Sequence, residues 1–435
     1  MQPSARAQAT LELLNSIWTG RLPADQTISA YFRKRRYAGA KDRTQIIEQV
    51  YKVLRNRGRL QCCLASSIDG ISGMPFCRAM YIAFQRVIEG SSQSDIQALF
   101  DPSGYGPSAL SSNEIQLLVM LRDTNETLPV WARCNYPIWL EEHIKTRFRD
   151  NYEAELEAFS KRAPLDLRVN TLRCSRDRIV DDFKTDNIGV VPTPWSRVGL
   201  RASSFHQMRS IGAFQEGRIE IQDESSQVAA MLVDARPGMQ VVDYCAGTGG
   251  KSLAMAATML DRGQIYACDS DQRRLALARP RLSRAGVRAV QLHHLTMTND
   301  PWLQPLESVA DRVLVDAPCT GSGTSRRNPD LFWKLQEVEI LRYQSIQIRL
   351  LNNASSLVRQ GGRLIYVTCS FFCDENEAVV SQFLKLKPEF RVVPVYNVWS
   401  NMLDGPCPAL GDYLLLSPAR HNTDAVFVAI LERCI

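Results

Sequence analysis

Two cysteines in the C-terminal half of the chain each follow an apolar run that has the length of a buried β-strand. Cys319 ends the run Arg312-Val-Leu-Val-Asp-Ala-Pro-Cys319, and Cys369 ends the run Arg363-Leu-Ile-Tyr-Val-Thr-Cys369. Such runs are typical of central strands in a parallel sheet. Ligands of open α/β sheets bind just beyond the carboxyl ends of the strands. We therefore expect both thiols to face one pocket, which indicates an enzyme.

The chemistry that suits two thiols is nucleophilic attack on carbon. A free thiol is only a few per cent ionised near pH 7, so it needs a positively charged neighbour to stabilise its thiolate. Lys251 and the pair Arg326-Arg327 can supply that charge. Asp316 is placed to hydrogen-bond a polar ring edge. Carbon 5 of a pyrimidine accepts a methyl group only after a thiolate has added to carbon 6. The carbon-5 proton must then leave and the thiol must be eliminated. One cysteine therefore adds to the ring, and a second group helps to release the methylated product. Spacing alone does not order the two thiols.

A glycine-rich turn, Asp243-Tyr-Cys-Ala-Gly-Thr-Gly-Gly-Lys251, leads from a predicted strand into a helix. Glycines let the backbone approach a ligand at the positive end of that helix. The turn lacks the glycine spacing of a triphosphate loop and of a dinucleotide fingerprint. The next strand ends in Asp269, where a doubly wound fold binds ribose hydroxyls. Ribose binding without phosphate machinery indicates S-adenosylmethionine.

The elements around these residues alternate between strand and helix from about residue 226 onward. Strands are predicted at 239–243, 264–268, 289–292, 312–316 and 363–368, and the runs 413–416 and 425–431 are expected to add antiparallel strands at one edge. Alternation of this kind predicts an α/β fold with a Rossmann-like, doubly wound sheet over residues 226–435.

The first 126 residues are predicted to form an all-helical domain. Apolar residues keep helical spacing from Leu11 to Trp18, ahead of Gly20, and again from Ile46 to Leu54. The segment 122–129 is expected to end this domain. Residues 127–225 are predicted to form a helix over 139–159 and then a small α+β unit with strands at 167–172, 189–191 and 218–222.

Composition and charge limit the class of protein. With 435 residues, 45% hydrophobic and 23% charged, the chain has the make-up of a soluble protein of two or three domains. Residues 1–60 hold twelve Lys and Arg against four Asp and Glu, a net charge of +8 where the whole chain has +6. This basic end favours binding to nucleic acid.

No apolar run is long enough for a membrane span and no secretory signal is evident, so a cytoplasmic protein is expected. The twelve cysteines and five histidines show no zinc spacing, and no metal is predicted.

The same segments resemble the RsmB/Sun family of S-adenosylmethionine-dependent RNA 5-methylcytosine methyltransferases. The resemblance rests on Asp-Ala-Pro-Cys319 with Arg-Arg-Asn-Pro-Asp330 after it, on Thr-Cys369-Ser with Glu375-Asn-Glu377 after it, and on the glycine turn. Further similar segments are Arg168-Val-Asn170-Thr, Ile221-Gln-Asp223-Glu-Ser-Ser-Gln227 and Asp424-Ala-Val-Phe-Val-Ala. The first 126 residues resemble the NusB-type helical RNA-binding domain of such proteins. The resemblance covers nearly the whole chain and is strongest from about residue 165.

This resemblance implies roles for individual residues. It implies that Cys369 attacks carbon 6, that Cys319 assists release, and that Asp316 and Lys251 address the cytosine. Cofactor contacts are implied for Cys245, Ala246, Gly247, Thr248, Gly249, Gly250, Lys251, Asp269, Arg274 and Asp316. RNA contacts are expected for Arg168, Asn170, Arg326 and Arg327.

The chain departs from the family pattern at two places. The family loop usually has Ala-Pro where this chain has Gly247-Thr248. The third strand usually ends in Gly-Asp, the acid contacting adenine, whereas this chain has Gln291-Leu-His293-His294-Leu295. The residue that contacts adenine therefore stays unassigned.

The leading hypothesis is an RNA cytosine-5 methyltransferase that acts on ribosomal RNA and is a monomer. Transfer RNA is an alternative substrate. A DNA cytosine-5 methylase would rely on a single Pro-Cys nucleophile, and the second cysteine argues against it. The two departures keep open a third alternative, a non-catalytic RNA-binding assembly factor with a methyltransferase fold.

Overall fold

The computed structural model describes residues 1–65, 74–121, 128–203, 208–297 and 300–434. These residues form two compact units, one of residues 1–161 with 325–335 and one of residues 162–324 with 336–435. The predicted domain boundary at residue 126 lies outside the described residues. The helical segment that precedes residue 161 joins the first unit, and the small α+β sheet that follows it joins the second. The predicted three-part division stays a prediction.

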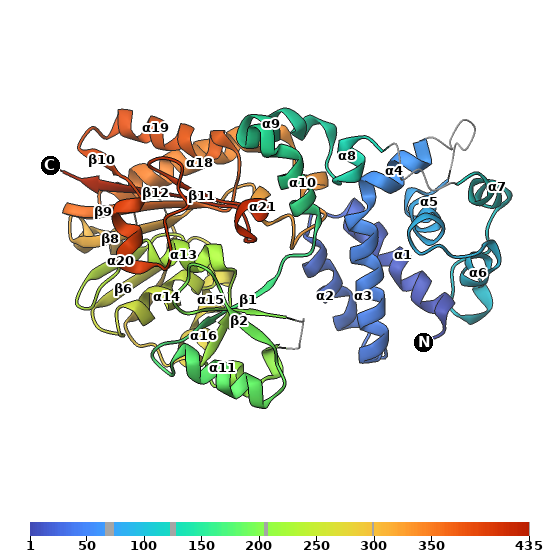
Figure 1. The fold of residues 1–435 in the computed structure, drawn as a ribbon, viewed down its shortest axis with the longest axis horizontal. Coiled ribbons are helices and arrows are strands. Elements are labelled where there is room, and N and C mark those ends of the chain that lie inside the picture. The colour runs from blue at the N-terminus through green and yellow to red at the C-terminus, as the bar shows by residue number, and fades with distance from the viewer. Residues whose placement is uncertain (66–73, 122–127, 204–207, 298–299, 435) are drawn as a thin grey trace. The chain divides into compact units, whose positions relative to one another are not determined.

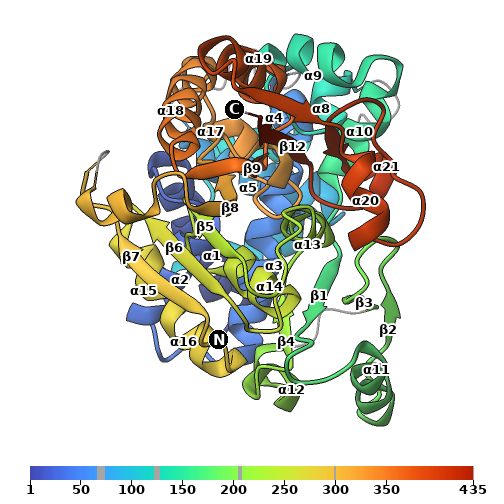
Figure 2. The ribbon, with the colours of Figure 1, turned by 90° about the vertical axis from the view of Figure 1, so that its left-hand side faces the viewer.

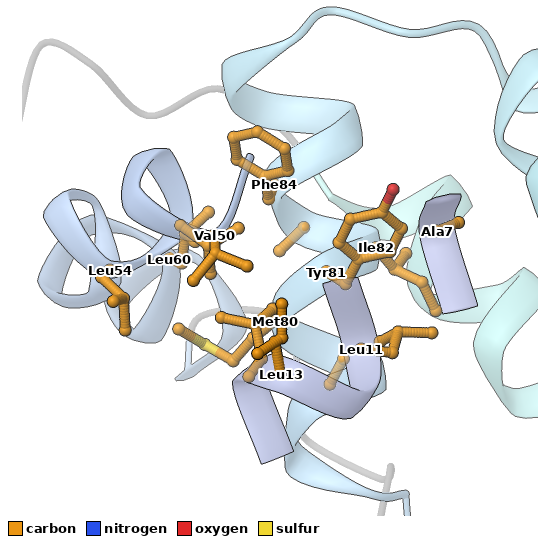
Figure 3. Packing of buried hydrophobic residues seen from close by; sticks show 14 of the residues in the cluster. Ala7, Leu11, Leu13, Val50, Leu54, Leu60, Met80, Tyr81, Ile82 and Phe84 are labelled. Carbon is orange, nitrogen blue, oxygen red and sulfur yellow. The ribbon is translucent and has the colours of Figure 1, made fainter. Parts of the chain in front are cut away.

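The first unit is helical, as the apolar stripes indicate. Its described α-helices are α1 (Pro3–Thr19), α2 (Ala24–Lys34), α3 (Ala40–Arg55), α4 (Arg57–Ala65), α5 (Phe76–Ala83), α6 (Gln93–Leu99), α7 (Ser112–Met120), α8 (Val130–Arg133), α9 (Glu141–Phe148), α10 (Tyr152–Ser160) and α17 (Leu331–Lys334). Leu11 and Leu13 of α1 pack with Val50 of α3 and Met80 of α5 in one buried core (Figure 3). Gly20 follows the last residue of α1, which confirms the predicted helix end.

The prediction of one continuous helix over residues 139–159 is wrong, because the structure has two helices there. Helix α9 ends at Phe148, and α10 begins at Tyr152 after a short 3₁₀ turn. Arg149 between them has a φ of 49°, a left-handed conformation that a continuous α-helix does not contain. The apolar pattern alone gave no sign of this break.

The second unit begins with a small antiparallel sheet. Its strands are β1 (Leu165–Val169), β2 (Val190–Pro192), β3 (Gly199–Ala202) and β4 (Ile219–Ile221), in the order β2-β3-β1-β4, with α11 (Arg176–Thr185) and α12 (Gly212–Gln215) beside them. The three predicted strands are confirmed. Strand β3 was not predicted, because it is four residues long and contains Gly199 and Arg201.

The large sheet of the second unit confirms the predicted α/β fold. Its strands are β5 (Gln240–Asp243), β6 (Gln264–Asp269), β7 (Val290–His294), β8 (Ala310–Asp316), β9 (Val358–Thr368), β10 (Phe390–Val393), β11 (Leu414–Leu416) and β12 (Val426–Arg433). The order is β10-β12-β9-β8-β5-β6-β7, and β11 also pairs with β12. The strands from β5 to β9 are parallel, and β10, β11 and β12 pair antiparallel. The C-terminal strands were expected at one edge, but β10 lies outside β12.

Helices cover both faces of this sheet, which makes it doubly wound (Figure 2). They are α13 (Glu224–Met231), α14 (Gly250–Thr258), α15 (Gln272–Ala276), α16 (Ala278–Ala285), α18 (Glu337–Ser355), α19 (Glu377–Leu386), α20 (Tyr396–Met402) and α21 (Pro418–His421). Ile365 and Val367 face the core under α13, α14 and α20, whereas Leu364 and Tyr366 face α18 and α19. This alternation is the two-residue period of a strand that is buried on both sides.

The chain runs outward from β5 to β7 and then returns to the other side of β5 as β8 (Figure 2), and Figure 1 shows β8 between β9 and β6. The point where the strand order reverses is therefore between β5 and β8. In open α/β sheets the crevice beyond the carboxyl ends of such strands is where ligands bind. No helix in the described ranges combines the length and the apolar character needed to cross a membrane.

Candidate active site

Cys319 and Cys369 lie beyond the carboxyl ends of two neighbouring parallel strands. β8 ends at Asp316, three residues before Cys319, and β9 ends directly before Cys369. The register sets Asp316 opposite Val367, so both loops leave the same edge of the sheet. The two sulfur atoms are 3.2 Å apart. The structure thus brings together the two thiols that the sequence predicts to share a pocket.

A cavity of about 650 Å³ opens at this edge of the sheet. Its walls are the loops that follow β5, β6, β7, β8 and β9, together with one side of α18. Cys319 and Cys369 line it, and so do Asp269 and Arg274. The volume lies within the roughly 300–1,000 Å³ that is usual for small-molecule sites. Four of the predicted cofactor residues, Cys245, Asp269, Arg274 and Asp316, therefore line the same cavity as the two cysteines.

Lys251 enters the site from the first turn of α14. Its Nζ lies 2.6 Å from Oδ2 of Asp316. Burial alone would lower the pKa of Lys251, but the attraction of Asp316, with a further contribution from Cys369, holds that pKa above its usual value. A buried ammonium group thus stays charged between the carboxylate at the end of β8 and the thiol at the end of β9.

The two thiols differ in their charged neighbours. Contact with the Cys369 sulfur, burial and the nearby carboxylate of Glu375 together raise the pKa of Cys319 well above its usual value. Cys369 has the positive charge of Lys251 close by, as the effect of this thiol on the pKa of Lys251 shows. Positive charge favours a thiolate and negative charge disfavours it. The two thiols thus have neighbours of opposite charge, a carboxylate near Cys319 and an ammonium group near Cys369.

The glycine turn has the backbone geometry that only glycine adopts freely. Gly247 has a φ of 54° and Gly249 a φ of 76°, and Gly249 is directly followed by α14. The backbone N–H of Gly247 donates to Oδ2 of Asp269 at 2.7 Å. A β-carbon on Gly247 would lie 2.6 Å from the guanidinium group of Arg274. A side chain at this position would therefore be strained and would displace Arg274.

Thr248, which stands where the family has proline, is held by a residue that the sequence did not single out. Arg281 Nη1 donates to both the backbone oxygen and the hydroxyl of Thr248, each at 2.8 Å. Arg281 also forms an ion pair with Glu220. A turn without proline is thus fixed by a guanidinium group from α16.

The remaining predicted cofactor residues lie in or next to this turn. Cys245 lines the cavity, and burial raises the pKa of its thiol well above the usual value. The backbone N–H of Ala246 donates to the oxygen of Cys268 at 2.8 Å, which ties the turn to β6. Gly250 is the first residue of α14.

Asp269 lies at the end of β6, as predicted, and it also organises the loops around it. One carboxylate oxygen accepts from Gly247 N–H, and the other accepts from Asp271 N–H at 2.7 Å. Each carboxylate oxygen has a second lone pair, so ribose hydroxyls can still donate to it. Arg274 lies over Gly247 from α15.

The third strand brings no acid of its own to the cavity. The His293 ring stacks on Trp302 with 4.1 Å between ring centroids, and His294 Nε2 lies 3.1 Å from the oxygen of Ser270. From this segment, Leu295, Thr296 and Met297 line the cavity. Asp300 accepts from the N–H of Thr296 at 3.1 Å, so the nearest acid downstream holds the loop in place.

Three of the four predicted RNA contacts, Arg168, Asn170 and Arg326, are internal to the protein, and Arg326 is 5% exposed. Arg168 is 3% exposed and Asn170 is 4% exposed. The Asn170 amide donates to the oxygens of Gly217 and Ala285 and accepts from Leu172 N–H, so it joins three loops. RNA contact through Arg168, Asn170 and Arg326 is therefore not supported. Arg326 and Arg327 belong to the other compact unit.

Sequence reasoning missed the contribution of α18 to the cavity wall. Tyr343, Arg349 and Asn353 line the cavity from this helix. Their helical spacing resembles that of any solvated helix face, so nothing local marked them. Within the described ranges, no group of three or more His, Cys, Asp or Glu side chains is arranged to hold a metal ion.

Comparison with known proteins agrees with this geometry. Residues 230–432 match the family model of the 16S rRNA methyltransferase RsmB/F, and residues 136–209 match the ferredoxin-like domain of RsmF/B-like methyltransferases. A probable ribosomal RNA small subunit methyltransferase B of Synechocystis sp. is 30% identical over 310 residues, which cover 71% of this chain and 69% of that protein. Its counterpart in Coxiella burnetii is 30% identical over 299 residues, 68% of this chain and 67% of that protein.

Two solved structures extend the likeness. The crystal structure of the protein called PH0851 has a TM-score of 0.80 and 27% identity, and it covers 99% of both chains. A methyltransferase homolog protein from Pyrococcus horikoshii has a TM-score of 0.60 and 29% identity, over 70% of this chain and 97% of that one. The chain belongs to the RsmB/F family of 16S rRNA methyltransferases and is an S-adenosylmethionine-dependent methyltransferase.

Proposed function

We propose that this enzyme methylates carbon 5 of a cytosine in ribosomal RNA and that Cys369 forms a covalent bond to carbon 6 of that base. One observation carries the proposal. The Cys319 and Cys369 sulfurs are in contact, 3.2 Å apart, on the wall of the cavity that Asp269 and Arg274 also line. Two thiols at a methyl-donor site suit a reaction that adds a sulfur to carbon and later expels it.

The residues of the cavity fit S-adenosylmethionine. The turn at Gly247 has no side chain, so a ligand can approach its backbone closely. Asp269 suits ribose hydroxyls, and no phosphate-binding loop is present in the turn. When bound, S-adenosylmethionine supplies an electrophilic methyl group on a positively charged sulfur.

Attack begins at the sulfur of Cys369, as the family resemblance implies. The sulfur adds to carbon 6 of the cytosine, and the electron pair of the C5=C6 bond becomes available at carbon 5. Lys251 Nζ bonds Oδ2 of Asp316, and the remaining oxygen of Asp316 can accept from the exocyclic amine of the ring. These two residues thereby orient the cytosine, as the family resemblance implies.

Release follows once carbon 5 carries the methyl group. The carbon-5 proton passes to a base, and Cys319, whose sulfur lies 3.2 Å from that of Cys369, assists this release. Elimination then breaks the bond between carbon 6 and the Cys369 sulfur, restores C5=C6 and returns the electron pair to Cys369. A cytosine inside a helix has to be flipped out of the stack before this chemistry can begin.

Ribosomal RNA is the proposed substrate because the family model and the relatives are ribosomal RNA methyltransferases of the small subunit. The basic first 60 residues support binding to RNA. No observation favours transfer RNA. The non-catalytic alternative is disfavoured, since both cysteines, Lys251 and Asp269 are present and correctly grouped. A cytoplasmic monomer and a NusB-like first domain stay predictions.

The experiment is a trap for the covalent intermediate. The Cys319→Ala protein is incubated with S-adenosylmethionine and unmethylated small-subunit ribosomal RNA and then run on a denaturing gel. We expect an RNA–protein adduct that persists, because elimination is slowed. The matched control is the Cys319→Ala/Cys369→Ala protein, which should give no adduct.

Other outcomes have definite meanings. An adduct in the Cys369→Ala protein, and none in Cys319→Ala, would reverse the order of the two thiols. An adduct with transfer RNA alone would move the substrate to that class. RNA binding with neither adduct nor methyl transfer in the wild-type protein would contradict the proposed reaction.

A further inference from the structure

Glu375 is buried behind both cysteine loops, and nothing in the proposed reaction uses it. It ends a 3₁₀ turn, Cys373–Glu375, just before α19, and it has no exposed surface. A carboxylate without solvent is costly unless donors surround it. Its carboxylate accepts four hydrogen bonds, and three of them come from residues that directly follow a cysteine.

The donors connect the two loops through this one carboxylate. Thr320, next to Cys319, donates its backbone N–H to Oε1 at 2.9 Å and its hydroxyl to Oε2 at 2.5 Å. Ser370, next to Cys369, donates its hydroxyl to Oε2 at 2.5 Å. Gln347 of α18 donates the fourth bond, 2.9 Å to Oε1.

Further bonds make the connection rigid. The N–H of Gly323 donates to the backbone oxygen of Cys369 at 2.9 Å. Asn376, the neighbour of Glu375, accepts from the Thr368 hydroxyl at 2.5 Å and donates to the Ser370 oxygen at 2.9 Å. The chain is thus held on both sides of Cys369.

A neutral side chain could make similar packing contacts, so the charge of Glu375 needs its own explanation. The groups that act on the Cys319 thiol are Cys369 and Tyr366 from β9 and the loop after it, Glu375 from the turn before α19, and Tyr343 from α18. Among these groups, Glu375 is the one whose ionised form is a carboxylate; burial raises its pKa above the usual value, and the bonds from Ser370, Thr320 and Gln347 oppose that shift. Its charge adds to burial and to the Cys369 contact in raising the pKa of Cys319.

We propose that Glu375 is a positioning residue whose carboxylate holds the two cysteine loops together and places a negative charge beside Cys319. The catalytic meaning of this inference rests on the proposed function. The geometric part does not, because it concerns the two thiols in the protein alone.

The test compares thiol reactivity in the full-length protein without RNA. Alkylation of Cys319 and Cys369 by iodoacetamide is followed by peptide mass spectrometry across a pH series. In the wild-type protein we expect Cys319 to react only at a pH well above neutral, because its pKa is raised. In Glu375→Gln, the Cys319 profile should shift down by about one pH unit or more, because the nearby negative charge is removed. The neighbouring Asp374→Asn protein, which loses an equal charge outside this network, should match the wild type.

Activity gives a second readout. We expect Glu375→Gln to lower kcat at least about tenfold, as misplaced catalytic groups do, while KM for S-adenosylmethionine stays within about twofold of the wild type. Thr320→Val removes one bond of the network and retains the charge of Glu375. It should lower kcat without shifting the Cys319 profile.

The outcomes separate the two proposals. Unchanged thiol profiles in Glu375→Gln, or equal shifts in Asp374→Asn, would overturn the inference about Glu375. A wild-type protein that shows the expected profiles but no cytosine methylation would instead overturn the proposed function and leave the role of Glu375 standing.

Discussion

Cys319 and Cys369 have the same side chain and touch, yet their neighbours differ in charge. Cys319 faces the carboxylate of Glu375, and Cys369 faces the ammonium of Lys251. The order of attack and release, which spacing along the chain leaves open, stays a proposal that rests on the family resemblance. The trapped-adduct experiment tests that order at the scale of single residues.

Asp243 offers a pH test at the same scale. It is 1% exposed at the end of β5, and burial raises its pKa to about 7, although the Ser252 hydroxyl, 2.6 Å from Oδ2, opposes the shift. The folded protein therefore holds this proton more tightly than the unfolded chain. The contribution of protonated Asp243 to the free energy of unfolding is complete below about pH 3.9 and is lost as the pH rises through about 7. The free energy of unfolding changes by about 4 kcal/mol over this range.

Asp243→Asn removes this dependence, because the amide does not titrate. Between pH 4 and pH 8 we expect its free energy of unfolding, relative to the wild type, to rise. Urea unfolding at several pH values measures the difference, and the exposed Asp412→Asn protein is the control. A difference between Asp243→Asn and wild type that stays constant with pH would contradict the raised pKa.

At the scale of elements, residues of neighbouring elements hold the turn between β5 and α14 as much as its own glycines do. Asp269 of β6 accepts from Gly247, and Arg281 of α16 donates to Thr248. A turn that lacks the proline of the family keeps its shape through these two neighbours. The cofactor site therefore depends on the packing of α15 and α16 as well as on the glycines.

Gly247→Ala tests the turn. Its φ of 54° strains any other residue, and the added β-carbon would meet the guanidinium group of Arg274. We expect the affinity for S-adenosylmethionine, measured by calorimetry, to fall at least about tenfold, since each strained position costs of order 1–3 kcal/mol. Gly238→Ala is the matched control, because Gly238 has a φ of 90° with no atom near its β-carbon position. It should lower the melting temperature and leave cofactor affinity unchanged.

At the scale of the whole molecule, the chain divides into a basic helical unit and a unit that carries the chemistry. The basic unit has a run of four cations, Arg33-Lys34-Arg35-Arg36, at the end of α2, and Arg33, Lys34 and Arg36 are exposed. Arg35 is engaged, with an ion pair to Glu12 at 3.0 Å and its guanidinium group 3.8 Å from the Tyr31 ring centre. The surface available to phosphates at this basic run is therefore formed by three of the four residues.

Changing Arg33, Lys34 and Arg36 together to Gln should weaken RNA affinity and flatten its salt dependence. If all three contact phosphates, the slope of log K against log salt falls by about two to three units. Filter binding at several salt concentrations measures this. The affinity for S-adenosylmethionine should not change, and Lys385→Gln/Lys387→Gln controls for loss of charge alone. A loss of cofactor affinity in the triple variant would contradict the separation of RNA binding by the basic unit from cofactor binding by the other unit.

The amino-acid sequence by itself determined the strands of the large sheet, the glycine turn, the ribose acid and the two strand-end cysteines. These features depend on patterns within a few residues, and parallel strands necessarily bring their carboxyl ends to one edge. Only the tertiary structure decided which residues meet at that edge. The Lys251–Asp316 pair, the support of Thr248 by Arg281, the wall formed by α18 and the link through Glu375 all join segments distant in the chain. Burial, too, is decided there: Arg168 and Asn170 look like RNA contacts in the sequence, yet they are internal because packing, which no local pattern encodes, surrounds them.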